Sequence, residues 1–140
     1  MSRVPQSQVL AASARLYRII LPVHDINASV KFYSFVFEAA GERVSPGRHY
    51  FNCGGTVLAV YSPEADGDDA GLGWSYHENQ YLYFSVSDLP AYQDKIEIAG
   101  GQILTHIEKM PLGEELFYAL DPMENRLSFV DAKTIFTGSD

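Results

Sequence analysis

Residues 16–26, LYRIILPVHDI, are echoed by residues 79–89, NQYLYFSVSDL. Each stretch is apolar, ends in Val-x-Asp followed by Ile or Leu, and runs into a segment whose apolar residues have helical spacing. Internal repeats have to be recognised before single elements are assigned, because they indicate a duplicated structural unit. The chain is therefore expected to contain two copies of one module.

The first copy reads as a strand, a helix and three further strands. The side-chain oxygen of Asp25 or Asn27 can accept from an unpaired backbone N–H at the helix start, and Gly41 is expected to end the helix. Gly54-Gly55 is typical of the turn of a hairpin. The strands of this copy are expected at Leu16–Val23, Glu42–Ser45, Arg48–Cys53 and Thr56–Tyr61.

The second copy repeats this order. Asp88 is expected to cap its helix, Pro90 fits the first helical turn, and Gly100-Gly101 ends the helix. The strands of this copy are expected at Gln80–Val86, Gln102–Glu108, Glu115–Leu120 and Arg126–Val130. The fold class predicted from both copies is α+β.

Length and composition predict one domain of ordinary globular type. The chain has 140 residues, and its composition is 46% hydrophobic and 20% charged. We expect an N-terminal arm over residues 1–15 and a single domain over 16–132, divided into module one (16–62), a linker (63–78) and module two (79–132). No segment is as long and apolar as a membrane span.

The net charge and the cysteine content limit the classes of binding partner and the cellular location that fit this sequence. The formal net charge of −8 disfavours nucleic acid or an anionic membrane as partner, because both require basic patches. The one cysteine, Cys53, excludes an internal disulfide framework and is compatible with a cytoplasmic location.

The order and spacing of four short motifs resemble the vicinal oxygen chelate superfamily, which includes glyoxalase I, extradiol dioxygenases and bleomycin-resistance proteins. The motifs are Val23-His-Asp25 with Ser29-Val-Lys-Phe-Tyr33, then Val86-Ser-Asp88-Leu, then Ala99-Gly-Gly101, and last Asp121-Pro122 with Asn125. The resemblance implies two tandem βαβββ modules that form a cup-shaped mixed sheet around a ligand, often closed by a homodimer. Glu124 departs from the family pattern, which usually has glycine there because the position commonly needs a left-handed backbone. If the last hairpin turns differently for this reason, the alignment of Ser128 with the family position shifts by one residue.

The resemblance also implies where a metal would be held: at Arg18, Tyr81, Ser128 and Ala59. Arginine only donates hydrogen bonds and stays charged, alanine has no donor atom, and serine and neutral tyrosine are poor ligands. We therefore predict no metal and no cofactor at this site. Whether His49 or His106 rebuilds a metal site elsewhere in the cup stays open.

Strand alternation predicts the residues that line the cup, because successive side chains of a strand point to opposite faces of the sheet. Arg18 is expected to bind a carboxylate or phosphate of the ligand or, alternatively, to pair with an internal acid such as Glu115 or Glu108. Trp74, from the linker, is expected to cover the cup or to contact a partner subunit. The predicted ligand-binding set is Arg18, Ile20, Ala59, Tyr61, Tyr81, Tyr83, Ser128 and Trp74.

The leading functional hypothesis is a metal-free, homodimeric protein that binds a small molecule with an anionic or aromatic group, for sequestration or sensing. One alternative is a metal-dependent lyase, isomerase or dioxygenase of the same superfamily whose ligands are displaced. Another is metal-independent acid–base catalysis by Tyr81, with Arg18 as the electrophile. Whether the protein is an enzyme is left open by the sequence.

Overall fold

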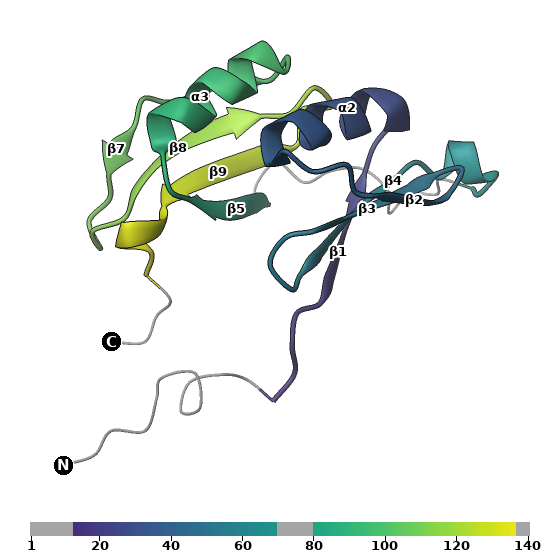
Figure 1. Ribbon diagram of the computed structural model, residues 1–140, viewed down its shortest axis with the longest axis horizontal. Coiled ribbons are helices and arrows are strands. Elements are labelled where there is room, and N and C mark those ends of the chain that lie inside the picture. The colour runs from purple at the N-terminus through teal and green to yellow at the C-terminus, as the bar shows by residue number, and fades with distance from the viewer. Residues whose placement is uncertain (1–12, 70–79, 137–140) are drawn as a thin grey trace.

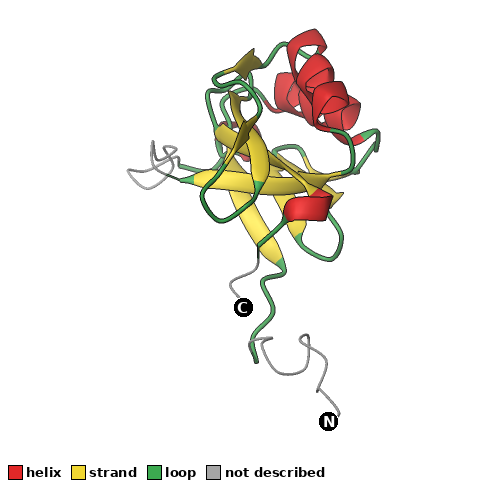
Figure 2. Ribbon diagram, turned by 90° about the vertical axis from the view of Figure 1, so that its left-hand side faces the viewer, coloured by secondary structure: helices red, strands yellow, loops and turns green. Residues whose placement is uncertain are grey.

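The computed structural model describes residues 13–69 and 80–136. These residues form two sheets and two α-helices in the predicted α+β arrangement (Figure 1). Figure 2 shows both helices on one side of the strands. Neither helix is long and apolar enough to cross a membrane.

Module one forms a four-stranded sheet in the order β1-β4-β3-β2. β1 runs parallel to β4, and the other neighbours are antiparallel. Its elements are β1 (Arg18–Pro22), α2 (Ile26–Phe37), β2 (Glu42–Ser45), β3 (Arg48–Asn52) and β4 (Val57–Tyr61), followed by the short helix η1 (Glu64–Asp66).

Module two forms a five-stranded sheet in the order β5-β9-β8-β6, with β7 also paired to β8. The parallel β5–β9 pair repeats the β1–β4 pair of module one. Its elements are β5 (Tyr81–Val86), α3 (Leu89–Ile98), β6 (Gln102–Ile103), β7 (Glu108–Lys109), β8 (Glu115–Leu120), β9 (Arg126–Asp131) and the short helix η2 (Ala132–Thr134).

The repeated Val-x-Asp motif performs the same task in both modules. Asp25 accepts from the backbone N–H of Ala28 at 3.0 Å, and Asp88 accepts from that of Ala91 at 3.1 Å. Each aspartate thereby satisfies one of the N–H groups that a helix start leaves unpaired. Of the two predicted caps for α2, the structure uses Asp25.

The end of α2 differs from the prediction. The helix ends at Phe37, and Glu38 takes the left-handed conformation (φ 52°), with its N–H bonded to the carbonyl groups of Phe35 and Ser34. Glu38 also forms an ion pair with Lys95 of α3. Left-handed conformations favour glycine, which is why the local pattern pointed to Gly41 instead.

The single strand expected at Gln102–Glu108 is also wrong. The structure has two two-residue strands, β6 and β7, separated by an irregular stretch. The last hairpin turns as the family pattern requires, because Glu124 adopts φ 65° despite its side chain. Ser128 pairs with Tyr83 and Tyr118 on the two sides of β9.

The helix-facing sides of both sheets share one hydrophobic core. Side chains from α2, including Phe32 and Val36, lie in the same cluster as Phe117 and Phe129 of module two. Phe37 of α2 contacts Phe84 of β5, with ring centres 5.3 Å apart. The two modules therefore dock through their helix sides, and neither of the two described α-helices covers the opposite face of a sheet.

Candidate functional site

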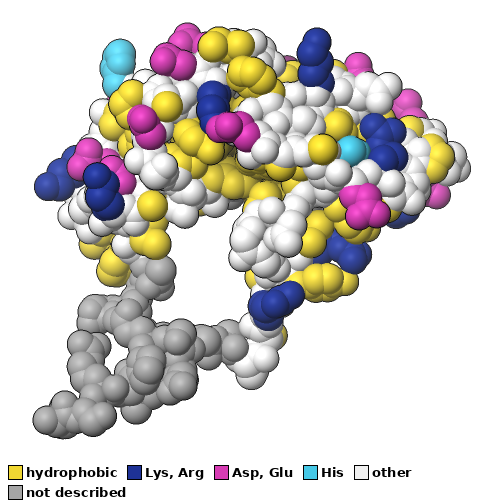
Figure 3. Space-filling model, in the orientation of Figure 1, with side chains coloured by type: hydrophobic (Ala, Val, Ile, Leu, Met, Phe, Trp, Pro, Cys, Tyr) yellow, Lys and Arg dark blue, Asp and Glu magenta, His cyan; other side chains and the backbone are white. Residues whose placement is uncertain are grey.

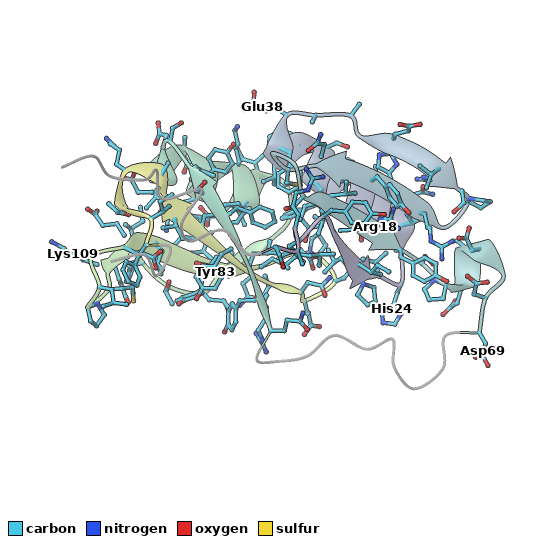
Figure 4. All side chains as sticks on the ribbon, turned by 90° about the horizontal axis from the view of Figure 1, so that it is seen from below. Arg18, His24, Glu38, Asp69, Tyr83 and Lys109 are labelled. Atoms are coloured by element: carbon cyan, nitrogen blue, oxygen red, sulfur yellow. The ribbon has the colours of Figure 1, made fainter. Side chains whose placement is uncertain are left out.

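The face of each sheet that points away from α2 and α3 is called the cup face below. On β1, Ile19 and Leu21 contact the core, so alternation places Arg18 and Ile20 on the cup face. Ile20 keeps 45% of its surface exposed. Figure 4, seen from below, shows Arg18 over the first sheet and Tyr83 over the second. Both modules thus contribute predicted residues to this side of the molecule.

Arg18 is held on the cup face by two tyrosine rings. Its Nη2 donates to the hydroxyl oxygen of Tyr17 at 2.8 Å, and its Cζ lies 4.9 Å from the Tyr17 ring centre and 5.1 Å from that of Tyr50. Within residues 13–69 and 80–136, no carboxylate forms a salt bridge with Arg18, and this includes Glu108 and Glu115. Most N–H groups of the guanidinium therefore remain available to an anion.

Ala59 and Ser128 form the floor of the cup face in their respective sheets. Ala59 lies between Ile20 and Tyr50 in the strand register, and Ser128 lies between Tyr83 and Tyr118. Both are at most 2% exposed. The Ser128 hydroxyl donates to the Phe117 carbonyl at 3.3 Å. The flanking side chains, rather than the floor, therefore present the surface that a ligand would meet.

Tyr61 is buried beside the loop that carries η1. Its hydroxyl donates to Asp68, and this hydrogen bond is the main cause that raises its pKa. The guanidinium of Arg48 lies 4.3 Å from the Tyr61 ring centre and forms a 3.0 Å ion pair with Asp66. Asp66 also accepts from the Ser45 hydroxyl. These contacts fasten the η1 loop to the sheet, so Tyr61 serves the local structure.

The cup face of module two is a cluster of three tyrosines. The Tyr81 and Tyr118 ring centres are 5.1 Å apart in an edge-to-face arrangement, and the Tyr83 and Tyr118 hydroxyl oxygens are 3.0 Å apart. The hydrogen bond to Tyr118 is the main cause that raises the pKa of Tyr83 to about 12. Tyr83 keeps 54% of its surface exposed, which leaves its ring open to contact.

Replacing Tyr118 with Phe is expected to lower the pKa of Tyr83 toward the ordinary tyrosine value, because the main cause of its shift is removed. In the wild type, a raised folded-state pKa means that this group loses stabilising effect as the pH rises from about 10 to about 12. Isotope-edited NMR of the Tyr83 ring over this pH range gives the titration midpoint of Tyr83 in the wild type and in the variant. An unchanged midpoint in Tyr118→Phe would show that the hydroxyl contact does not control the proton.

A cavity of about 730 Å³ lies between the two modules. It is bordered by β1, by the β3–β4 hairpin, by the full length of β5 and by Tyr92 of α3. Of the predicted ligand-binding residues that the structure describes, Tyr81 and Tyr83 line this cavity. Arg18 is adjacent to it, because Ile19 and the register partner Val57 are lining residues.

The positions that the family resemblance assigns to a metal do not fit one. Arg18 would repel a cation, Ala59 has no donor atom, and the hydroxyl of Ser128 is buried and bonded to a carbonyl group. Among the described residues, no three His, Cys, Asp or Glu side chains come together in a group that could hold a metal ion. No chemical step is therefore assigned to a metal here.

The two histidines considered as replacements are placed elsewhere. His49 lies on the helix side of β3, where Nδ1 accepts from Arg43 Nε at 3.2 Å and Nε2 is 2.8 Å from the Ala40 carbonyl oxygen. His106 is exposed and lies between β6 and β7, not on a strand as expected. Trp74 falls outside the described residues, so its predicted role stays a prediction.

Two residues next to the predicted set were missed. Tyr50 contacts Arg18 from β3, and Tyr118 bonds to Tyr83 from β8. Alternation within each strand would have placed both on the cup face, because Phe51 and Phe117 are their core-facing neighbours. The pairing register that brings them to Arg18 and Tyr83 is not encoded in either strand alone.

Comparison with protein-family models matches residues 15–129 to the Glyoxalase/Bleomycin resistance protein/Dioxygenase superfamily. A comparison with curated proteins found no match.

Similar solved structures include a glyoxalase-related enzyme from Fulvimarina pelagi, with 22% identity, a TM-score of 0.74, and coverage of 90% of this chain and 95% of that one. A glyoxalase/bleomycin resistance protein/dioxygenase family enzyme from Burkholderia phytofirmans PsJN has 19% identity, a TM-score of 0.72, and coverage of 85% and 99%. Lactoylglutathione lyase from Agrobacterium tumefaciens has 22% identity, a TM-score of 0.62, and coverage of 88% and 96%. At these identities the likeness shows the fold, and the family match over most of the chain identifies the protein as a member of the glyoxalase/bleomycin resistance protein/dioxygenase superfamily.

Proposed function

We propose that this protein binds a small molecule with an anionic group, and that Arg18 anchors that group. The observation that carries the proposal is the state of the Arg18 guanidinium. It is exposed on the cup face and braced by Tyr17 and Tyr50, and no carboxylate among the described residues neutralises it. A guanidinium fork fits a carboxylate or phosphate by two parallel hydrogen bonds.

The aromatic surroundings favour a ligand with a flat body. Tyr50 in module one and Tyr83 in module two present rings on the cup face, and Ile20 adds exposed apolar surface. Apolar walls with a few polar groups that fix orientation are the usual composition of a small-molecule site. Aromatic carboxylates therefore combine both features and form the ligand class proposed for this site.

Replacing Arg18 with Ala is expected to weaken the binding of an aromatic carboxylate such as 2-naphthoate by about tenfold to a hundredfold, because the charge-assisted pair is lost. Arg18→Lys should recover part of the affinity, since lysine keeps the charge without the fork. Titration calorimetry measures both variants. Arg15→Ala is the matched control, because Arg15 is an exposed arginine just ahead of β1. Equal affinity in Arg18→Ala and wild type would reduce Arg18 to a structural residue.

The proposed role is sequestration or sensing without a metal. It is supported by the poor fit of Arg18, Ala59 and Ser128 to a cation. Elemental analysis of the purified protein is expected to find no stoichiometric zinc, nickel, iron or manganese. A bound metal at one equivalent that is lost in His49→Ala or His106→Ala would instead favour a metal-dependent lyase, isomerase or dioxygenase with displaced ligands.

The protein is also proposed to be a homodimer that closes the cup over its ligand. The supporting observation is the apolar surface left exposed on the cup face, where Ile20 is 45% and Tyr83 is 54% exposed. A second copy would cover the same surface on both subunits, as symmetric dimers do. Sedimentation velocity over a range of concentrations is expected to give a dimer, which Tyr83→Glu should dissociate; a monomer at all concentrations contradicts this.

A further inference from the structure

The cavity between the modules has walls made of core-type side chains. Ile19, Phe51 and Leu58 contribute from module one, and Leu82, Phe84 and Phe129 contribute from module two. These six side chains belong to the shared hydrophobic core or pack against it, so they come from the helix side of the sheets, whereas Tyr81 and Tyr83 border the cavity from the cup face. The cavity is therefore an opening into the core at the seam of the two modules. In Figure 3, hydrophobic side chains gather in the hollow between them.

Among the residues that the structure describes, no charged side chain lines this cavity. Glu38, which follows the lining residue Phe37, is neutralised by an ion pair with Lys95. Arg18, which precedes the lining residue Ile19, lies on the cup face and is not itself a lining residue. The ammonium group of Lys95 also lies 4.5 Å from the ring centre of the lining residue Tyr92. An ionised ligand would lose its hydration on entry and find no opposite charge, which is costly in an apolar site.

We propose that this cavity is a second ligand site, separate from Arg18, and that it takes an uncharged aromatic or alicyclic molecule. Its volume of about 730 Å³ is in the range that holds multi-ring small molecules. Phe37 of module one and Phe84 of module two both line the cavity and are partly exposed, so a ring from each module is open to a flat ligand. Cys53 and Tyr92 are among the lining residues, and their thiol and hydroxyl groups are uncharged polar groups of the kind that orient a ligand without requiring it to be charged.

Cys53 supplies a reporter for this site, because it lines the cavity and is the only cysteine in the sequence. Alkylation of its thiol by N-ethylmaleimide can be followed by mass spectrometry in the wild-type chain without any substitution. The uncharged probe N-phenyl-1-naphthylamine is expected to slow this alkylation by about tenfold when its free concentration is ten times the dissociation constant. Its fluorescence should rise with one-to-one stoichiometry over the same concentrations.

The preference of the cavity for an uncharged ligand is tested with a second probe that differs from the first by one charged group. The sulfonate 8-anilino-1-naphthalenesulfonate has the same ring system plus one negative charge, so it should protect Cys53 much less at equal concentration. Both measurements are repeated in Arg18→Ala, where protection by the uncharged probe should be unchanged. Loss of aromatic carboxylate binding in that variant, with protection of Cys53 intact, would separate the two sites.

Three results would overturn the proposal. The first is an alkylation rate that the uncharged probe does not change. The second is equal or better protection by the sulfonate, or protection that disappears in Arg18→Ala, which would place the probe at the guanidinium. The third is an alkylation rate that decreases as the protein concentration is raised without any probe, since this would mean that a second copy of the chain fills the cavity. Cys53→Trp, which adds bulk inside the cavity, should abolish the fluorescence rise, and its retention would also count against the site.

Discussion

Replacing Asp121 with Ala is expected to lower the free energy of unfolding by about 3–4 kcal/mol. Asp121 is 3% exposed and accepts four hydrogen bonds. The donors are the Tyr33 hydroxyl at 2.6 Å, the backbone N–H of Met123 at 2.8 Å, and the backbone and side-chain N–H groups of Asn125 at 2.9 Å. Truncation would leave these buried donors without an acceptor, which is more costly than the net value of a satisfied hydrogen bond.

The position of this carboxylate explains why the effect should be large. Tyr33 belongs to α2 of module one, whereas Asp121 and Asn125 form the turn between β8 and β9 of module two. Three of the four hydrogen bonds therefore shape the turn, and the one from Tyr33 ties the two modules together. Burial first, and then the charge of Asp121, hold the pKa of Tyr33 well above its ordinary value, so this hydroxyl keeps the proton that it donates.

Urea unfolding, followed by circular dichroism, measures the change in the free energy of unfolding. A double-mutant cycle with Tyr33 then shows how much of this change comes from the Tyr33–Asp121 hydrogen bond. Tyr33→Phe alone is expected to cost about 1.5–3 kcal/mol, because one hydrogen bond to a charged group is lost. In the Asp121→Ala background the same substitution should cost little, since the hydroxyl no longer has its acceptor. Additive effects of the two substitutions would show that the contact between the modules contributes no stability of its own.

The elements of the fold that depend on neighbouring residues were predictable. The caps Asp25 and Asp88 each act on an N–H three residues later, so the sequence alone could identify them. The end of α2 was not predictable, because Glu38 takes a left-handed conformation that favours glycine over residues with a side chain. Glu124 is a similar case: its positive φ is held by the turn around Asp121 rather than by its own preference.

In the candidate site, too, features set within one strand were predictable, and features set by the pairing of strands were not. Alternation placed Arg18 and Ile20 on the cup face, but the rings that brace Arg18 depend on how β1, β4 and β3 align. The cavity at the seam was not foreseen at all. It depends on how the two sheets dock, and the apolar residues that form its walls look in the sequence like ordinary core positions.

Gly41 is the second position where a small change should have a large effect. Gly41→Ala is expected to cost about 2–4 kcal/mol, from a positive φ that disfavours side chains and from overpacking. Its φ is +64°, and an added Cβ would lie 2.7 Å from the Tyr50 carbonyl oxygen, 2.8 Å from His49 Nε2 and 2.8 Å from a ring carbon of Phe51. His49 cannot move aside freely, because its Nε2 is 2.8 Å from the Ala40 carbonyl oxygen.

Gly54 is the matched control for this experiment. It also has a positive φ, +76°, but a Cβ added there would meet nothing within 4 Å. Gly54→Ala should therefore cost only the backbone preference, about 1–2 kcal/mol. Urea unfolding of the two variants separates the conformational part from the steric part, because the first is common to both glycines. Equal losses at the two positions would mean that the contact of Gly41 with β3 relaxes without cost, and that its role is conformational alone.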